Sequence, residues 1–241
     1  MPTADGSPPT VRRSARWQAK RCGATTSAAI DPSSRYARQF PEQRSVDGER
    51  FPTLVEVFTL VKAHDKPVRL NIETKIDPTR PDDTVDPATF ARLVIEAVRN
   101  ARMEDRVTVQ SFDWRTLVEV KRLAPGIPTA CLTMETADHD TVKPSAAGPS
   151  AWTAGFDLRN YANSVPRLAH AAGCNVWSPL ATNVTAAYVS EAHDLGMLVL
   201  PWTVNDPVVM ARLIDQGVDG LITDYPDRLR KLMGDRGLAL P

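Results

Sequence analysis

The stretch VRLNIETKI (residues 68–76) decides the fold, because it has the length of a buried strand and one polar face. Side chains along a strand alternate between the two faces of a sheet. Leu70, Ile72 and Thr74 therefore share one face, and the opposite face carries only polar residues: Arg69, Asn71, Glu73 and Lys75. Charged side chains enter an interior only when they are paired or bound to a ligand. The pattern indicates a strand whose polar face lines a lumen or a binding site.

Short apolar stretches alternate with amphipathic ones along the rest of the chain. Five further strands are predicted, at residues 106–112, 127–133, 174–179, 197–205 and 219–224. Helices fill the intervals, and Asp or Asn residues stand where a helix would need its N-terminal cap, as at Asp86, Asp113 and either Asn205 or Asp206. A strict β-α-β order predicts right-handed crossovers and a parallel sheet.

Two closures of such a sheet fit the pattern: an open doubly wound sheet or a barrel. The sequence contains no GxGxxG motif, which counts against a dinucleotide-binding sheet. A complete (β/α)₈ TIM barrel needs eight strands, whereas six are predicted. We therefore expect an α/β fold of TIM-barrel type that lacks the first two strands, in a domain spanning 46–235. Residues 1–45 show neither the two-residue period of a strand nor the 3.6-residue period of a helix, and they are expected to be an irregular or disordered N-terminal segment.

Composition narrows the class of protein further. The chain has 241 residues, of which 42% are hydrophobic, and its 29 basic and 29 acidic residues give a net charge of zero. That balance argues against a nucleic-acid partner, and no apolar run is long enough to predict a membrane span. The three cysteines, Cys22, Cys131 and Cys174, have no metal-binding spacing and are interpreted as buried or spare thiols.

The polar face of the strand 68–76 ends with two charged residues, Glu73 and Lys75, that could bind a ligand. In a barrel, the C-terminal ends of the strands form the catalytic rim, and Glu73 and Lys75 are at that end. A carboxylate such as that of Glu73 suits a hard cation, Mg²⁺ or Ca²⁺. An ammonium such as that of Lys75 suits a phosphate oxygen. The alternative is a structural Glu–Lys pair at an exposed strand end.

Polar or aromatic residues recur at the ends of other predicted strands. Gln110 lies near the end of the second predicted strand and Trp202 near the end of the fifth, so both are candidates to bind substrate. Trp202 could equally be a core residue whose indole N–H is satisfied. The four histidines, His64, His139, His170 and His193, fall in predicted loops and helices, which favours structural or surface roles.

Four segments, in order, resemble the glycerophosphodiester phosphodiesterases. LNIETK (70–75) is similar to a LNIEIK-type strand of that family, and VTVQSFDWRTL (107–117) to its next strand and helix. Residues 196–229 resemble its C-terminal signature, a tryptophan strand followed by GVDG and ITD. Residues 40–58 resemble the linker and first helix of a bacterial branch. The similarity extends over about residues 31–230.

The resemblance implies hydrolysis of a small-molecule glycerophosphodiester to glycerol 3-phosphate and an alcohol. A divalent cation, Ca²⁺ or Mg²⁺, would polarise the phosphate, and two histidines would act as general acid and base. By position, Glu73 matches the metal-binding glutamate of the family. Lys75 matches the catalytic lysine that faces the phosphate, and Trp202 matches the tryptophan of the pocket wall.

The sequence also departs from the family pattern. The family begins with His-Arg-Gly, Pro-Glu-Asn-Thr and Glu-x-Asp motifs, none of which is present here, followed by a His-Asp pair that does not occur at the expected place, before residue 40. Two interpretations follow: a hydrolase chain that begins late and is inactive, which we favour, or a non-catalytic phosphate-binding or partner-completed remnant of the barrel. The sequence does not specify the metal, the preferred alcohol or the oligomeric state. Localisation also stays open, because relatives of this branch are often exported.

Overall fold

The structure is a computed structural model that describes Arg38 and residues 52–240. The chain forms two compact units: Met1–Val68 with Asp82–Thr84, and Arg69–Pro81 with Val85–Pro241. The predicted irregular segment, residues 1–45, lies outside the described residues except at Arg38.

The first unit contains helix α3 (Leu54–Lys62), which begins with a capping box formed by Thr53 and Glu56. The Thr53 hydroxyl accepts from the Glu56 N–H at 3.2 Å, and Glu56 Oε2 accepts from the Thr53 N–H at 2.6 Å. The two bonds satisfy donors that a helix start leaves free. Phe58 and Val61 form the buried side of the helix, as its apolar spacing predicts.

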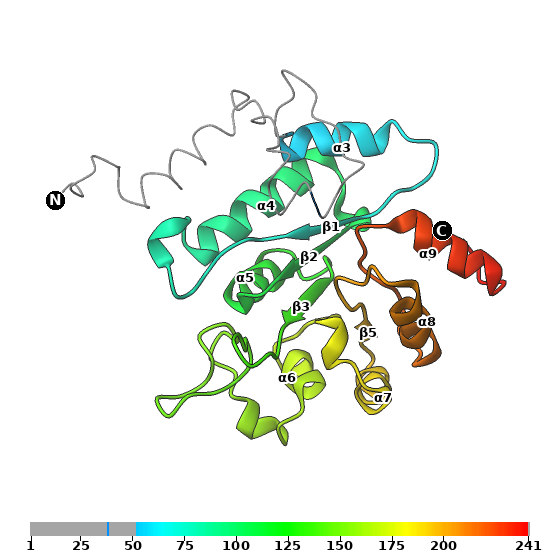
Figure 1. Ribbon diagram of the computed structural model, residues 1–241. Helices are drawn as coiled ribbons and strands as arrows, with labels where there is room; N and C mark the ends of the chain where they lie inside the picture. Colours follow the sequence, from blue (N-terminus) through cyan, green and yellow to red (C-terminus); the bar gives the residue numbers. More distant parts are fainter. Residues whose placement is uncertain (1–37, 39–51, 241) are drawn as a thin grey trace. The chain divides into compact units, whose positions relative to one another are not determined.

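The second unit is built on a parallel sheet of five strands. These are β1 (Leu70–Glu73), β2 (Val107–Ser111), β3 (Thr129–Thr133), β4 (Val176–Pro179) and β5 (Leu198–Val199). Their spatial order is β1-β2-β3-β4-β5, so each strand pairs with its neighbours along the chain (Figure 1). A doubly wound sheet reverses its order at a switch point. The unbroken order is that of a barrel wall and not of a doubly wound sheet, as the predicted fold class requires.

Helices follow the strands and form an arc around them (Figure 1). They are α4 (Pro87–Ala101), α5 (Trp114–Leu123), α6 (Val165–Ala171), α7 (Ala186–Asp194), α8 (Pro207–Asp215) and α9 (Pro226–Asp235), with short 3₁₀ turns η1 (Pro81–Asp83), η2 (Glu104–Arg106), η3 (Leu158–Tyr161) and η4 (Ala181–Asn183). The predicted caps at Asp86 and Asp113 accept from main-chain N–H groups of α4 and α5. Asp206, rather than Asn205, caps α8.

The core of this unit lies between the sheet and the helices. Val107 and Val109 of β2 are fully buried, as are Trp114 and Leu117 on the inner side of α5. Thr74 and Ser111 lie on the same buried side, because the alternation along β1 and β2 directs it toward the helices. The polar residues Asn71, Glu73 and Gln110 therefore point to the opposite, inner face of the sheet.

The last two predicted strands are shorter than the sequence indicated. Only Leu198–Val199 of 197–205 is regular strand, and 219–224 is not a regular strand. The segment nevertheless runs beside β5, with main-chain bonds from Asp219 N to Val199 O, from Ile222 N to Pro201 O and from Val204 N to Ile222 O. Pro201 has no N–H to donate, so the pairing is interrupted there.

A second proline weakens the pairing on the other side of β5. In the parallel pattern, an N–H at position 179 would bond the Leu200 carbonyl, but Pro179 has none. The Ser178 hydroxyl donates to the Leu200 carbonyl instead, at 2.6 Å. The sequence-based prediction followed apolar alternation alone and gave these two prolines no weight.

Two cysteines are joined, contrary to their interpretation as free thiols. Cys131 of β3 and Cys174, which precedes β4, form a disulfide with their Cα atoms 5.8 Å apart. Both residues are buried. They are 43 residues apart in sequence, a separation that gave no local signal, and the sheet alone brings them together.

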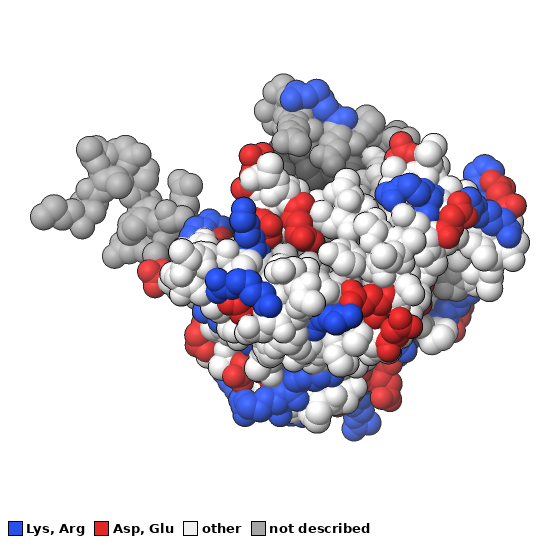
Figure 2. All heavy atoms as spheres, turned by 90° about the horizontal axis from the view of Figure 1, so that it is seen from below, with Lys and Arg blue, Asp and Glu red and all other residues white. Residues whose placement is uncertain are grey.

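Charged side chains of both signs occur on the face of the molecule that Figure 2 shows. On that face, basic and acidic groups are interspersed among uncharged ones, in keeping with the net charge of zero. Among residues 52–240, no helix has both the length and the apolar character needed to cross a membrane.

Candidate functional site

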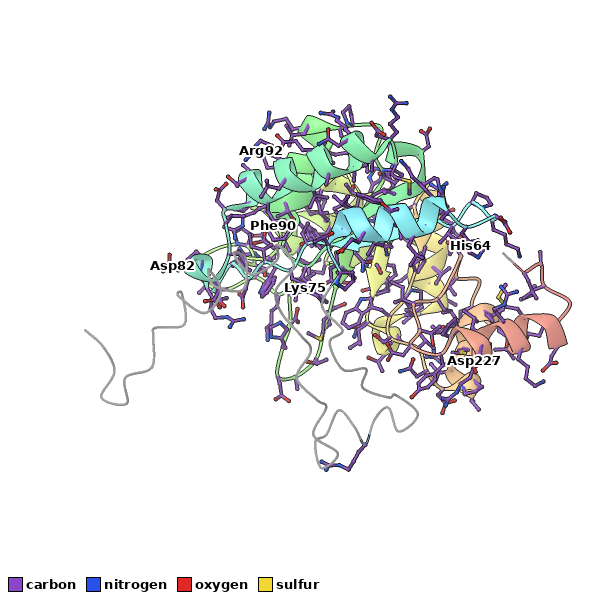
Figure 3. The ribbon with its side chains drawn as sticks, turned by 90° about the horizontal axis from the view of Figure 1, so that it is seen from above. His64, Lys75, Asp82, Phe90, Arg92 and Asp227 are labelled. Carbon is purple, nitrogen blue, oxygen red and sulfur yellow. A yellow bond between two sulfur atoms is a disulfide. The ribbon has the colours of Figure 1, made fainter. Side chains whose placement is uncertain are left out.

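Glu73 and Lys75 meet at the C-terminal end of β1. Glu73 is the last residue of the strand, and its Oε1 lies 2.6 Å from Lys75 Nζ. The Glu73 side chain is 21% exposed and that of Lys75 is 78% exposed. Figure 3 labels Lys75 on the segment that follows β1. The structure thus brings the two predicted residues together, and such contact suits both a phosphate site and the structural pair.

The carboxylate of Glu73 is suited to serve as one ligand of a divalent cation. Its Oε1 is buried and has no hydrogen-bond donor in suitable geometry, although Lys75 Nζ is close. Carboxylate oxygens are the ligands that Ca²⁺ and Mg²⁺ prefer. Within the described part of the chain, however, no group of three or more His, Cys, Asp or Glu residues could hold a metal ion. Among the residues that the structure describes, Glu73 is therefore a candidate for one ligand of such a cation.

Gln110 lies beside Glu73 on the neighbouring strand. The two residues are register partners in the β1–β2 pair, and Gln110 is buried. Its Oε1 accepts from Asn71 Nδ2 at 2.6 Å, which fixes the amide against β1. Gln110 therefore shares the inner face with Glu73, as the predicted substrate-binding role requires.

A series of aromatic rings in mutual contact lies at the C-terminal ends of the strands. Phe112 follows β2, and its ring centroid is 5.2 Å from that of Trp202, which follows β5. Phe112 is also 6.4 Å from Trp152, which in turn is 5.9 Å from His139. All three contacts are edge-to-face, the arrangement that aromatic quadrupoles favour. We call these four residues the aromatic series.

The contact between Phe112 and Trp202 requires the sheet to curl. Strands β3 and β4 separate β2 from β5, so in a flat sheet the two would be about 14 Å apart. Side chains stand roughly perpendicular to a sheet. Rings that meet at 5.2 Å therefore lie on a concave inner face, which is the geometry of a barrel wall.

The surroundings of Trp202 are compatible with both interpretations of its sequence position, a packed core residue and a pocket wall. Its indole Nε1 donates to the Ser178 carbonyl at 2.9 Å, as a packed tryptophan requires. The residue is only partly buried, and its ring belongs to the aromatic series. It lies on the inner face near the strand ends, where a substrate wall would stand.

Sequence reasoning undervalued Phe112 and Trp152. Phe112 stands between the polar residues Ser111 and Asp113, and Trp152 lies in a long irregular stretch after β3. The Trp152 carbonyl accepts from the Trp114 N–H at 2.9 Å, which ties that stretch to the start of α5. No periodicity reports such a contact, although aromatic residues in a polar loop were a usable signal.

Glu135 is a partly buried carboxyl group in the loop after β3. Burial, and after it the negative charge of Asp140, raise the pKa of Glu135. The main chain of Glu135 is bonded to the amide of Asn183, whose Oδ1 accepts from its N–H and whose Nδ2 donates to its carbonyl, at 3.0 and 2.8 Å. The loop after β3 is thereby fastened to the loop after β4.

Asn205, in the segment between β5 and α8, binds the end of the segment 219–224. Its Nδ2 donates to Asp224 Oδ2 at 2.8 Å, and its Oδ1 accepts from the Asp224 N–H at 2.9 Å. Asn205 and Asp224, the last residues of the predicted strands 197–205 and 219–224, thus bind each other. Their contacts stabilise the closing segment of the sheet.

The four histidines lie outside the strands, as predicted. His193 and Asp219 are joined through Nε2 and Oδ2 at 2.9 Å, and His170 belongs to α6. His64 follows α3, and its Nδ1 accepts from the Lys66 N–H at 3.0 Å. Only His139 contacts the aromatic series among the histidines, all of which the structure describes.

Comparison with known proteins gives this edge of the sheet its context. A sequence model of the "Glycerophosphoryl diester phosphodiesterase family" matches residues 10–228, so the match begins before the region that the motifs indicated. A curated "Glycerophosphodiester phosphodiesterase" of Caldanaerobacter subterraneus is 29% identical over 190 residues. The alignment covers 79% of this chain and 65% of that protein, so the chain spans just under two thirds of this relative's length.

Solved structures agree on the fold. A glycerophosphoryl diester phosphodiesterase structure from Silicibacter pomeroyi is 34% identical, with a TM-score of 0.73, and the match covers 89% of this chain and 66% of that one. An Oleispira antarctica phosphodiesterase, solved with the product sn-glycerol-3-phosphate, shares the fold at 21% identity, a TM-score of 0.56 and coverages of 76% and 61%. With its barrel-ordered sheet, the chain belongs to the glycerophosphoryl diester phosphodiesterase family of phosphoric diester hydrolases.

Proposed function

We propose that the chain binds a glycerophosphodiester at the strand ends where Glu73 and Lys75 meet, and that it serves metal-dependent hydrolysis of such diesters to glycerol 3-phosphate and an alcohol. The observation that carries the proposal is the 2.6 Å contact of Glu73 Oε1 with Lys75 Nζ at the end of β1 in a chain of this family. Further support comes from the Oleispira antarctica protein, whose structure holds sn-glycerol-3-phosphate.

Each side chain has a distinct role in this proposal. The Lys75 ammonium binds a phosphate oxygen as a point charge. Glu73 contributes one carboxylate to a divalent cation, Ca²⁺ or Mg²⁺, which when bound supplies positive charge beside the phosphate. Gln110 holds the inner face by its bond to Asn71 and presents an amide to the substrate. Trp202 forms the apolar wall.

We further propose that a polypeptide of these 241 residues hydrolyses diesters slowly on its own. The described histidines lie in loops and helices, and only His139 approaches the aromatic series. A positioned acid or base typically contributes about 10²–10⁴-fold in rate. We therefore expect turnover at least about 100-fold below that of relatives that carry the histidine motifs.

A second candidate function is phosphate binding without catalysis, or with catalysis completed by a partner. One observation favours it: among the residues that the structure describes, no three metal-binding side chains gather. Lys75 and Gln110 would still offer a cation and an amide to glycerol phosphate. In this case binding would be measurable and turnover would be absent.

The two functions separate in one experiment. The purified chain is incubated with glycerophosphocholine and Ca²⁺, Mg²⁺ or a chelator, and released glycerol 3-phosphate is measured with a coupled enzyme. Calorimetry with glycerol 3-phosphate is run in parallel. Metal-dependent release that Glu73→Ala abolishes supports the hydrolase, whereas binding without release supports the second function. Absence of both binding and release would refute both.

A further inference from the structure

Four polar side chains are buried between the end of β1 and the start of α5. Thr74, Ser111, Asp113 and Thr116 are at most 1% exposed, and none of them has a role in the proposed chemistry. A buried polar group costs stability unless it is hydrogen-bonded. We call this set the Thr74 cluster. Its members are hydrogen-bonded to one another.

The Ser111 hydroxyl links β1 to α5 directly. It donates to the Thr74 carbonyl at 3.0 Å and accepts from the Asp113 N–H at 3.1 Å. The Thr74 N–H in turn donates to the Gln110 carbonyl at 2.9 Å. Pairing between β1 and β2 therefore continues past Glu73, the last regular residue of β1.

The two threonine hydroxyls form a directed chain. Thr116 Oγ1 donates to the Asp113 carbonyl at 2.8 Å, and it is 2.9 Å from Thr74 Oγ1. A hydroxyl has a single proton to give. Because that of Thr116 goes to Asp113, Thr74 must be the donor in the bond between the threonines. Both ends of the chain are fixed, since Asp113 also caps α5.

The position of Thr74 gives the cluster its consequence. Thr74 stands between Glu73 and Lys75, and alternate residues of an extended chain point to opposite faces. Holding the Thr74 side chain toward α5 therefore directs its two neighbours to the inner face, where Glu73 Oε1 and Lys75 Nζ meet at 2.6 Å. Without this anchor, a residue as exposed as Lys75 would have many rotamers open to it.

We propose that Thr74, Ser111 and Thr116 are positioning residues, which hold Glu73 and Lys75 in one place on the inner face without touching substrate. Their importance for ligand binding rests on the function proposed above. Their effect on the Glu73–Lys75 contact does not, and it can be measured separately.

The test replaces the hydroxyls and follows Lys75. Thr74→Val and Thr116→Val keep the branched shape and remove the donor, whereas Thr74→Ser keeps the hydroxyl. Thr133→Val is the matched control, because Thr133 is fully buried at the end of β3 and accepts from Trp177 Nε1 at 3.0 Å. The Lys75 ¹³Cε NMR signal reports the ion pair, and Glu73→Gln gives its position when the pair is broken.

We expect both valine variants to move the Lys75 signal toward its position in Glu73→Gln and to weaken glycerol 3-phosphate binding about tenfold. Thr74→Ser should restore both properties, and Thr133→Val should change neither. An unmoved Lys75 signal in the two valine variants would overturn the positioning role while the proposed function stands. A moved signal in a chain that does not bind glycerol 3-phosphate would uphold the positioning role and refute the proposed function.

Discussion

Phe112 and Trp202 lie edge to face with ring centroids 5.2 Å apart. Phe112 follows β2 and Trp202 follows β5, and strands β3 and β4 lie between these two in the sheet. This contact is the clearest sign that the sheet curls into a barrel wall. Phe112 follows Gln110 by two residues, as Lys75 follows Glu73, the register partner of Gln110, so Phe112 and Lys75 both come just after the paired ends of β2 and β1.

The curl can be tested by a double-mutant cycle on Phe112→Ala and Trp202→Ala. Edge-to-face pairs contribute about 0.5–1.5 kcal/mol beyond area burial, so we expect a coupling of that size in the free energy of urea unfolding. The edge-to-face pair of Trp177 in β4 and Tyr188 in α7, with centroids 5.7 Å apart, serves as the reference for the size of the coupling energy. Strict additivity for Phe112 and Trp202 would mean that the rings do not meet in solution.

Replacing Lys75 by Met should weaken ligand binding and leave stability unchanged. A charge-assisted bond to phosphate contributes about 1.5–3 kcal/mol, so we expect at least a tenfold loss of glycerol 3-phosphate affinity by calorimetry. An ion pair this exposed contributes about 0–1 kcal/mol to folding. Lys231→Met breaks another exposed pair, with Asp235 at 2.7 Å, and should leave affinity intact. Equal losses in the two variants would contradict a specific site.

Glu191 should stabilise the fold at neutral pH and cease to do so in acid. Burial alone would raise the pKa of Glu191, but bonds from Ser164 and Arg167, both 2.5 Å long, hold that pKa below its usual 4.5. A lowered folded pKa gives stability that is present above 4.5 and is lost as pH falls through the folded value. Glu191→Gln should therefore be less stable than wild type at pH 7, with the gap closing below pH 4.5.

Urea unfolding at several pH values measures that gap. Asp194→Asn removes one negative charge from the same helix and controls for net charge. A Glu191→Gln deficit of constant size from neutral to acid pH would show that the carboxylate charge has no part in it.

Glu135 should show the opposite sign. Its pKa is raised by burial and by Asp140, so stability falls as pH rises from the unfolded value of 4.5 through the folded pKa. We expect Glu135→Gln to unfold at a higher temperature than wild type at pH 7, and at the same temperature below pH 4.5. The main-chain bonds to Asn183 survive the change. A lower unfolding temperature at pH 7 would contradict this account.

Removing the Cys131–Cys174 disulfide should be costly. The bond joins residues 43 apart, and loop-closure entropy for such a separation corresponds to about 4 kcal/mol. We expect Cys131→Ser with Cys174→Ser to lower the urea midpoint clearly, as reductant should in the wild type. Cys22→Ser is the control. Three free thiols titrated in the native protein would show that the disulfide does not form.

The order of the elements could be predicted from the sequence because local patterns encode it. The capping box at Thr53, the caps at Asp86 and Asp113, and the alternation along 68–76 all depend on residues a few positions apart. The placement of Glu73, Lys75 and Gln110 followed from the same alternation and the parallel pairing. Membership of the family followed from four short segments.

What escaped prediction depends on residues distant in sequence. The disulfide, the contact of Phe112 with Trp202 and the Thr74 cluster each join different elements, and no period or spacing reports them. The end of the sheet was overestimated for a different reason. Apolar alternation suggested strands at 197–205 and 219–224, whereas Pro179 and Pro201 lack the N–H groups that regular pairing needs.

Those two prolines have a consequence for ligand binding. The Trp177–Val199 register, extended by two residues, sets them opposite each other immediately before Leu180 and Trp202. Proline fixes its φ near −65°, so the backbone that presents Trp202 has few conformations to lose when a ligand arrives. In the proposed site, this backbone would therefore lose little conformational entropy on association, which would keep the cost of binding low beside Trp202.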